Sequence, residues 1–404
     1  MVLNRLVDPK SKRGCNDWLR DLAYFPEWTE KWDVQDFYRA LDILHDHWDE
    51  VEAILYRALW ERTPPELRKV WLVDTTSMYF EMTRSDKELA ELFDEHVEAE
   101  LTGKEPPLAP VPQVVNREPF FRMRGHNKDG HPGDPQVVIA SIVTPGGQIV
   151  RHRTYPGNTN DLTIAQDLIA TVPAPAGTVR VWVSDAGTVD DERLLSLDLD
   201  GWDRVTAEAL RKDPWVEEHL LKRPGRFKQS TEDSKFSYRE VTFSAEDLAM
   251  GRPEKFILVR NAFERERQLK RLAKQKSEVQ EALAGQRDEK PHGKRLCDVA
   301  SNPSLKKFLK PSDKAPGQFV FDEATYKREV RLAGTRLLRT TLTAWDAQDV
   351  HTAYGLLQEV ERNHRELKTP LMLRPCYQRA DHRIKAHVMI NVRAINCLRQ
   401  MEHL

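Results

Sequence analysis

The sequence predicts an α/β protein whose mixed sheet, with flanking helices, is interrupted by a β-rich insertion. Strand-like and helical segments alternate over residues 66–200, which is typical of α/β folds. Residues 201–345 change character and combine short strand-like pieces with one long charged helix. Helical periodicity returns over residues 346–404. We therefore expect a core in two parts, 66–200 and 346–404, separated by the insertion 201–345.

The composition is typical of a folded, soluble chain and argues against a membrane protein. The 404 residues are 40% hydrophobic and 31% charged, with a formal net charge of -2. No apolar run approaches the roughly 18–20 residues of a membrane helix, and the four cysteines form no zinc-binding pattern. We expect a reduced cytoplasmic protein. A nucleic-acid surface would require local clustering of charge, such as the nine Lys/Arg against four Asp/Glu in residues 361–404.

The N-terminal region, residues 1–65, is predicted to be helical. Its apolar residues recur at the spacing of amphipathic helices, as in Leu41, Leu44, Val51, Ile54 and Leu55. One interpretation of this region is a truncated DNA-binding part in front of the core.

Two predicted strands of the core lead to aspartates. Val70 to Val73 form a short apolar run, which predicts a buried strand that ends at or near Asp74. A second strand alternates valines in the stretch GTVRVWVSDAG and ends at Asp185. Each aspartate alone is more typical of a turn or a helix cap than of a catalytic site.

The other elements follow from periodicity and turn residues. The predictions are a hairpin that turns at residues 145–147 and helices over 160–170, 263–285, 346–370 and 381–401. Asp346 or Asp349 is the expected cap of the helix that Pro370 stops. The charged helix over 263–285 has two open interpretations: a solvent-exposed helix or hairpin, or a DNA contact.

A polar stripe marks the helix over 346–370. Tyr354, Glu361 and Lys368 stand seven residues apart, so each side chain returns to within roughly 20° of the last and the stripe is about 21 Å long. A core helix would carry Leu or Val at such positions, and a solvated face has little need of tyrosine. Chance spacing on a surface helix is the alternative.

The order of the elements predicts that three carboxylates converge. The strands that lead to Asp74 and Asp185 can lie parallel because a helical crossover separates them. Their carboxyl ends would then bring the two aspartates together, at the edge where open α/β sheets usually bind ligands. Glu361, on a helix packed against the sheet, would complete the cluster.

Three converging carboxylates repel one another unless a cation lies between them. Hard oxygen ligands with open coordination positions suit Mg²⁺ or Mn²⁺. Two such ions about 3.5–4 Å apart can support phosphoryl transfer. A lysine and a tyrosine on the same helix could then bind phosphates along it.

The ordered set of motifs resembles the insertion-sequence transposases with a DDE active site on an RNase H-like fold. The similarity is to the branch with the signature Tyr-x2-Arg-x3-Glu-x6-Lys, whose spacing Tyr354, Glu361 and Lys368 match. Further matching stretches are VDTTSMYFE, VSDAG, GHNKDGHPGDPQVVIASIV and YPGNTND. The resemblance covers roughly residues 65–404. Leu357 stands where the signature has arginine, and Arg365, four residues after Glu361, is the expected substitute.

The resemblance implies specific roles. Asp74, Asp185 and Glu361 would bind two Mg²⁺ or Mn²⁺ ions, and Lys368, Tyr354 and Arg365 would contact DNA. The partners would be double-stranded DNA with terminal inverted repeats and a target DNA, bound by a homodimer in a bacterial cytoplasm. The reaction would cleave a strand at the transposon end and transfer its 3′-hydroxyl to the target, while the insertion grips that end.

Two alternatives remain at this point. A metal-dependent nuclease on the same fold would cut DNA strands but never join them. A decayed transposase without catalytic activity would bind DNA and neither cut nor join it. Strand-transfer products separate the first alternative from a transposase, and metal-dependent nicking separates both enzymes from the second alternative.

Overall fold

The computed structural model describes most of the chain in two compact units. The described residues are 1–23, 32–62, 71–109, 116–127, 130–131, 133–160, 163–164, 167–168, 171, 181–184, 201–211, 214–248, 252–285, 294–313 and 317–402, without the side chains at 62, 71, 74 and 184. The first unit comprises Met1–Thr206, Met250–Arg252 and Thr352–Leu404, and the second comprises Ala207–Ala249 and Pro253–His351.

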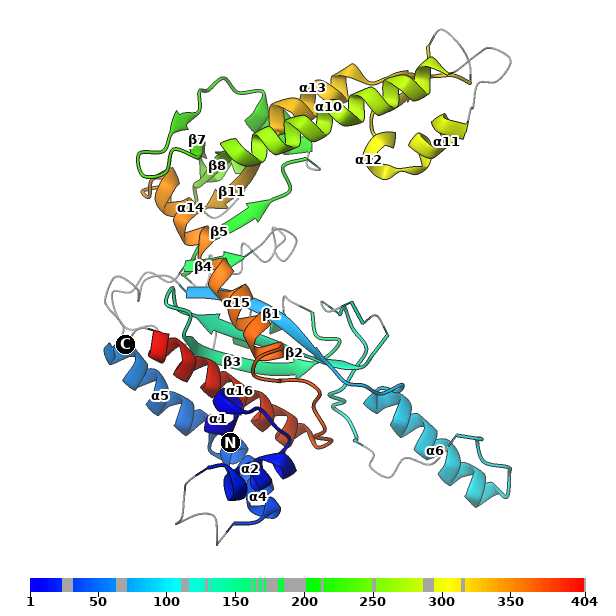
Figure 1. Ribbon diagram of the computed structural model, residues 1–404, viewed down its shortest axis with the longest axis vertical. Coiled ribbons are helices and arrows are strands. Elements are labelled where there is room, and N and C mark those ends of the chain that lie inside the picture. The colour runs from blue at the N-terminus through cyan, green and yellow to red at the C-terminus, as the bar shows by residue number, and fades with distance from the viewer. Residues whose placement is uncertain are drawn as a thin grey trace. The chain divides into compact units, whose positions relative to one another are not determined.

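A mixed sheet forms the centre of the first unit (Figure 1). Its strands are β1 (Trp71–Tyr79), β2 (Gln136–Val143), β3 (Ile149–Pro156), β4 (Val181–Ser184) and β5 (Asp203–Glu208), in the order β3-β2-β1-β4-β5. β2 pairs antiparallel with β1 and β3, whereas β4 pairs parallel with β1 and β5 pairs parallel with β4. This order and these directions confirm the predicted RNase H-like mixed sheet.

Helices surround this sheet. They are α1 (Val2–Val7), α2 (Lys12–Asp21), α4 (Val34–Asp46), α5 (Trp48–Arg62), α6 (Asp86–Thr102), α15 (Leu357–Lys368) and α16 (Asp381–Glu402), together with the end of α14 (Ala347–Gly355). Local sequence fixes where two of them begin: Asp33 caps α4 and Ser85 caps α6, each in a capping box.

Alternation along β2 places different helices on the two faces of the sheet. Val138, Ala140 and Ile142 join a core cluster that contains Leu59 of α5. Ser141 points to the opposite face, since successive side chains alternate, and its hydroxyl meets His364 of α15. The sheet is therefore covered by α5 on one face and by α15 on the other.

The C-terminal helix α16 is joined to β3 by a buried amide. Asn396 accepts a hydrogen bond from the Ile149 amide and donates one to the Ile149 carbonyl, both at 2.8 Å. α16 also packs against α1 and α4. Their shared cluster contains Leu41, Trp48 and Ile390. The N-terminal helices thus belong to the same core as the C-terminal helix.

The second unit contains an antiparallel sheet and a cluster of helices. The sheet has the order β11-β8-β7-β6, from Thr335–Thr340, Glu254–Asn261, Phe236–Phe243 and Lys228–Gln229. The other elements are η2 (Val216–Leu221), α9 (Ala245–Leu248), α10 (Ala262–Ala284), α11 (Lys294–Ser301), α12 (Pro303–Lys306), β9 (Leu309–Pro311), β10 (Phe319–Phe321) and α13 (Glu323–Leu332). The predicted strands and the long charged helix of the insertion are confirmed. The helices α11, α12 and α13 were not foreseen.

Two expectations about single elements are wrong. β1 does not end near Asp74 but continues to Tyr79, because residues 72–79 all pair with β2. The predicted helix over 346–370 is two helices, α14 and α15, with a break at Leu356. The Leu356 amide is shared between the carbonyls of Thr352 and Ala353, directly after Gly355, a residue that weakens helices.

Candidate active site

Helix α15 lies over β1 and β2 in the first unit (Figure 1). Its buried residues Val360, Asn363, His364 and Leu367 recur at the spacing of one helix face. His364 Nε2 lies 3.4 Å from Ser141 Oγ, and both side chains are buried. Ser141 is the cross-strand partner of Asp74. The helix that carries Glu361 therefore crosses the sheet at the position of Asp74.

A buried polar network fixes the position of α15. The Asn363 amide donates a hydrogen bond of 2.7 Å to the Gly147 carbonyl in the β2–β3 turn. Its oxygen accepts one of 3.0 Å from Arg399 of α16. Arg399, only 1% exposed, also reaches Glu366 at 2.5 Å and Glu402 at 3.0 Å. Buried charges of this kind hold one geometry when every donor is satisfied.

The turn at Gly147 is shaped for this network. Gly147 has φ +78°, a left-handed conformation that suits glycine. A Cβ atom at this position would lie 2.9 Å from Arg399 Cδ. The predicted Pro-Gly-Gly hairpin turn is confirmed, and its glycine also makes room for the arginine that anchors α15.

The flank of α15 carries an exposed acid and an exposed base. Glu361 lies about 100° around the helix from buried Val360, and Arg365 follows four residues later. Both are exposed, and neither side chain has a hydrogen bond or ion pair with any other described residue. The other two acids of this helix are paired: Glu359 lies 3.7 Å and Glu366 3.0 Å from Arg362. Glu361 is therefore the carboxylate of this helix that is available to a ligand.

The predicted stripe does not lie on one helix. Tyr354 is in α14 and is only 7% exposed, whereas Glu361 and Lys368 are in α15. Lys368 is the last residue of α15 and is partly exposed. Leu357, at the signature's arginine position, is the first residue of α15 and partly buried. Glu361, Arg365 and Lys368 lie on one helix, and Tyr354 lies before the break.

The two aspartates are described to different extents. The backbone of Asp74 is the fourth residue of β1, while its side chain lies outside the described part. Asp185 lies outside the described residues altogether; Ser184, before it, ends β4. Asp74 is two residues after Leu72, and Asp185 is two residues after Val183, which is the parallel partner of Leu72.

No group of three His, Cys, Asp or Glu side chains that could hold a metal ion occurs among the described residues. Of the predicted ligands, the described set contains only the Glu361 side chain. The chemistry of the predicted set, three carboxylates, fits Mg²⁺ or Mn²⁺ better than a softer metal.

Sequence reasoning did not identify the residues that position the site. Ser141 lies more than two hundred residues before Asn363, and Arg399 lies on the next helix, so no local pattern connects the three residues. The available signal was weak: Asn363 and Arg399 stand at buried positions of amphipathic helices, where apolar residues are usual.

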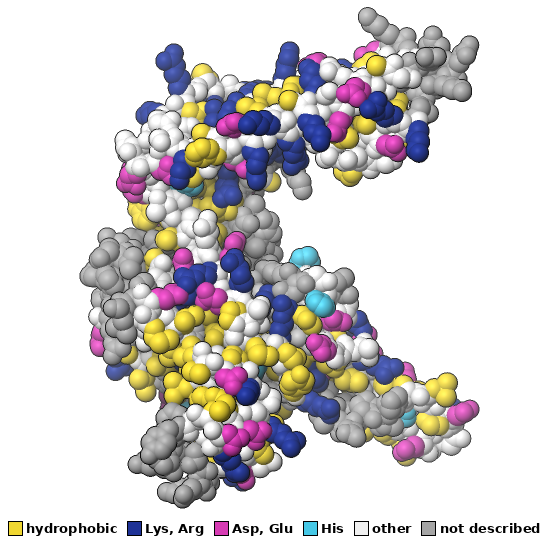
Figure 2. Space-filling view, viewed as in Figure 1, with side chains coloured by type: hydrophobic (Ala, Val, Ile, Leu, Met, Phe, Trp, Pro, Cys, Tyr) yellow, Lys and Arg dark blue, Asp and Glu magenta, His cyan; other side chains and the backbone are white. Residues whose placement is uncertain are grey.

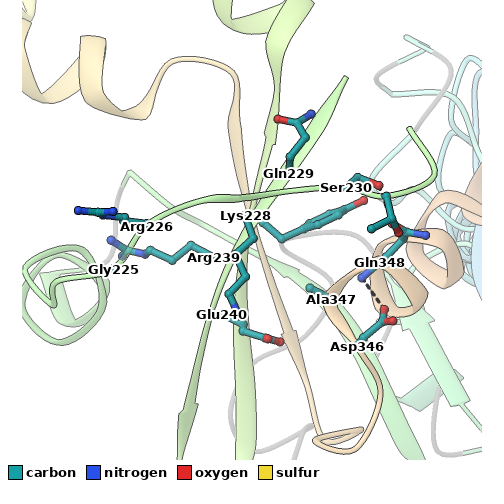
Figure 3. A pocket seen from close by; sticks show the side chains of 12 residues that line it. Gly225, Arg226, Lys228, Gln229, Ser230, Arg239, Glu240, Asp346, Ala347 and Gln348 are labelled. Carbon is teal, nitrogen blue, oxygen red and sulfur yellow. Dashed lines mark hydrogen bonds between the residues drawn. The ribbon is translucent and has the colours of Figure 1, made fainter. Parts of the chain in front are cut away.

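An open groove of about 450 Å³ lies in the second unit (Figure 3). Its lining residues come from the β6–β7 region and the start of α14. Figure 3 shows Arg226 and Arg239 toward one end and Gln348 and Asp346 toward the other. Asp346 accepts hydrogen bonds from the backbone amides of Gln348 and Asp349 at 2.9 and 2.8 Å and so caps α14. The capping role predicted for Asp346 is confirmed.

The acids of this groove have hydrogen-bond or ion-pair partners, whereas two of its cations have none among the described residues. Glu240 lies 3.3 Å from Lys255, and Asp346 is engaged as the helix cap. Arg226 and Lys228 are exposed, and their side chains form no ion pair or hydrogen bond with other residues of the described ranges. The groove therefore offers unpaired positive charge together with polar donors.

Positive charge also gathers on α10, where Figure 2 shows Lys and Arg side chains. Here three of the six cations are paired within the helix: Arg267 with Glu264 at 2.6 Å, Lys270 with Glu266 at 2.7 Å, and Lys274 with Glu278 at 3.9 Å. These pairs follow the i,i+3 and i,i+4 spacing of a solvated helix.

Comparison with known proteins yields only distant structural similarity. No protein-family model and no curated protein matches the sequence. A solved structure of a piggyBac transposase synaptic complex with hairpin DNA is similar, with a TM-score of 0.41 and 12% sequence identity. The alignment covers 100% of this chain and 64% of that one. In the described ranges, no helix is both long and apolar enough to span a membrane.

Proposed function

We propose that the protein is a DDE transposase, which cleaves a DNA strand at a transposon end and joins the 3′-hydroxyl to target DNA. The observation that carries the proposal is the placement of Glu361. It is an exposed carboxylate without a partner among the described residues, on a helix that crosses β1 at the position of Asp74. The motifs in the sequence supply the reaction type.

The third carboxylate of the proposed site is Asp185. Leu72 and Val183 are partners in the parallel pairing of β1 and β4. Asp74 lies two residues after Leu72, and Asp185 lies two residues after Val183. We expect a parallel register to bring them to one edge of the sheet. Asp74 is opposite Ser141, whose face α15 covers. Cross-strand partners share a face, so the proposed carboxylates would meet beneath α15.

Asp74, Asp185 and Glu361 are proposed to hold two Mg²⁺ or Mn²⁺ ions. Bound there, the ions would neutralise the carboxylates and stabilise the charge on the attacking and leaving oxygens. The chain's own residues would bind and orient the DNA. Arg365 and Lys368, at the end of α15, are proposed to bind phosphates near the cleaved bond, because charge-assisted hydrogen bonds to phosphate are strong.

The remaining DNA contacts are proposed for the second unit. Arg226 and Lys228 offer unpaired charge beside Gln229 and Ser230 in the groove of Figure 3. Phosphate contacts of this type position DNA without reading its sequence. They fit the proposed grip of the insertion on a transposon end with a terminal inverted repeat, held by a homodimer. Tyr354, only 7% exposed, is proposed as a further phosphate contact.

The test is strand cleavage by the full chain on a labelled duplex that carries the element's own end, with Mg²⁺ or Mn²⁺. Glu361→Gln should lower the rate by roughly a thousand-fold or more, because it removes a metal ligand without changing size. The matched control is Glu359→Gln, the same change two residues away on a carboxylate paired with Arg362; it should cleave normally. Asp74→Asn and Asp185→Asn should behave like Glu361→Gln.

The outcomes separate the proposal from its rivals. Joined products that need both metal and Glu361 support a transposase. Nicking without joined products would indicate a nuclease, and DNA binding without nicking would indicate a decayed protein. Normal cleavage by Glu361→Gln would remove Glu361 from the site.

A further inference from the structure

The chain leaves α15 in a conformation that must be held from outside. α15 ends at Lys368, and the next residues fold back, with the amides of Leu371 and Leu373 bonded to the carbonyls of Glu366 and Leu367 at 3.0 and 2.9 Å. Met372 has φ +48°, a left-handed conformation that a side chain disfavours. Such residues persist where the surroundings hold them.

Basic side chains bind three successive carbonyls of this segment. Arg5 of α1 donates to the carbonyls of Leu371 and Met372, at 3.3 and 3.1 Å. His387 of α16 lies 2.8 Å, through Nε2, from the Leu373 carbonyl. Arg5 is 5% exposed and His387 is 3% exposed. The contacts therefore lie inside the first unit, away from competing water.

Lys12 of α2 sets the direction of the His387 hydrogen bond. Lys12 Nζ lies 3.0 Å from His387 Nδ1, and Lys12 is only 4% exposed. Burial lowers the pKa of Lys12 to about 8, so below pH 8 the side chain is an ammonium group, which can only donate. Nδ1 therefore accepts, and the ring proton is on Nε2, which donates to Leu373. Burial, with the nearby Lys12 and Arg5 charges, lowers the pKa of His387 well below its ordinary value. The imidazole is thus kept neutral, as this arrangement requires.

We infer that Arg5, Lys12 and His387 are positioning residues that hold the end of α15, and with it Arg365 and Lys368, in place. The N-terminal helices would then contribute to the site by supporting the end of α15, without touching DNA. The catalytic consequence rests on the proposed function. The structural statement does not, because it concerns the segment 369–373 alone.

Hydrogen exchange of the full chain tests the structural statement. His387→Leu and Arg5→Met should speed amide exchange at residues 371–373 by about tenfold or more, while β1 and β2 stay protected. His387→Gln should restore protection, because the amide can accept from Lys12 and donate to Leu373. Lys10→Met is the matched control for Lys12→Met, because Lys10 is a partly exposed lysine nearby that pairs with Asp8.

Unchanged exchange at residues 371–373 would overturn the inference. So would a uniform rise over the whole first unit, since these residues would then only stabilise the fold. This measurement needs no activity, so it decides the inference even if the unmodified protein fails to cleave, a result that would count against the proposed function alone.

Single-turnover cleavage provides the second readout. Lys12→Met and His387→Leu should slow cleavage at saturating DNA by roughly tenfold, since small misplacements of binding groups are costly. DNA affinity should change less than the cleavage rate, because Arg365 and Lys368 are only two of the proposed phosphate contacts. Cleavage at the normal rate despite fast local exchange would also overturn the positioning role.

Discussion

Helices α10 and α15 are both rich in charge, and they use it differently. On α10 three of the four exposed cations pair with acids of the same helix, as Lys270 does with Glu266. On α15 the buried face carries Asn363 and the exposed flank carries Glu361 and Arg365 without partners in the described part of the chain. The paired charges of α10 are those of a solvated helix, whereas the unpaired charges of α15 are available to a ligand.

The largest expected effect on stability tests the buried side of this comparison. Arg399→Met removes the guanidinium that joins Asn363, Glu366 and Glu402, and it should destabilise the protein by on the order of 3 kcal/mol. Urea unfolding with a probe in the first unit measures it. Arg271→Met on exposed α10 is the matched control, and its unfolding midpoint should not move measurably. Equal midpoints for the two variants would contradict the contrast.

Buried charge should also make the first unit sensitive to acid. Glu52 contacts Arg151, His152 and Arg153. Burial alone would raise the pKa of Glu52, but the hydrogen bond with His152 and the charges of both arginines outweigh it, and the pKa is lowered to about 2. Because the folded pKa lies below the ordinary value of 4.5, this contribution is complete above pH 4.5 and is lost as the pH falls toward 2.

Two buried histidines should lower stability at a higher pH than Glu52 does. Burial lowers the pKa of His152 and of His387 below the ordinary 6.5. Their unfolded forms bind protons first, so stability falls as the pH drops below 6.5. Unfolding free energies measured between pH 8 and 4 should show this decline, and His387→Gln should reduce it. An identical pH profile for that variant would argue against the assignment.

The turn beneath Arg399 gives a smaller effect. Gly147→Ala imposes a positive φ on alanine and places its Cβ against Arg399, so we expect a loss of about 2 kcal/mol. Gly103→Ala is matched to it: the φ is +67° and a Cβ would meet nothing within 4 Å. That variant should lose only about 1 kcal/mol. Thermal unfolding of both variants isolates the contact with Arg399.

The smallest effect concerns the break between α14 and α15. A Cβ at Gly355 would also meet nothing within 4 Å, so Gly355→Ala should raise stability by about 0.5–1 kcal/mol through helix propensity. Circular dichroism and thermal unfolding measure it. A loss of stability would show that the break has a tertiary cause rather than a local one.

Local patterns predicted the regular elements well. The long charged helix α10, the hairpin β2–β3 and the last helix α16 follow from periodicity and turn residues that act over a few positions. The extent of β1 was underestimated. Its continuation from Asp74 to Tyr79 depends on the pairing of each residue with β2, which is not visible within the strand itself.

The candidate site was predictable only in its chemistry. Spacing identified Glu361 and Lys368, and both lie on α15. The same spacing placed Tyr354 on one helix with them, which the break at Leu356 contradicts. The positions of Asn363, Ser141 and Arg399 depend on contacts between different segments of the chain. Asn363 and Gly147, for example, are more than two hundred residues apart. No pattern within a single segment contains that information.

The position of Arg399 gives the last turn of α16 an unexpected importance. A shortened chain that stops at Leu398 would keep every strand of the sheet and each proposed catalytic residue. It would lose both Arg399 and Glu402, and with them the anchor of Asn363. A nonsense mutation at position 399 should therefore destabilise the first unit at least as much as Arg399→Met, although it removes no strand and no proposed catalytic residue.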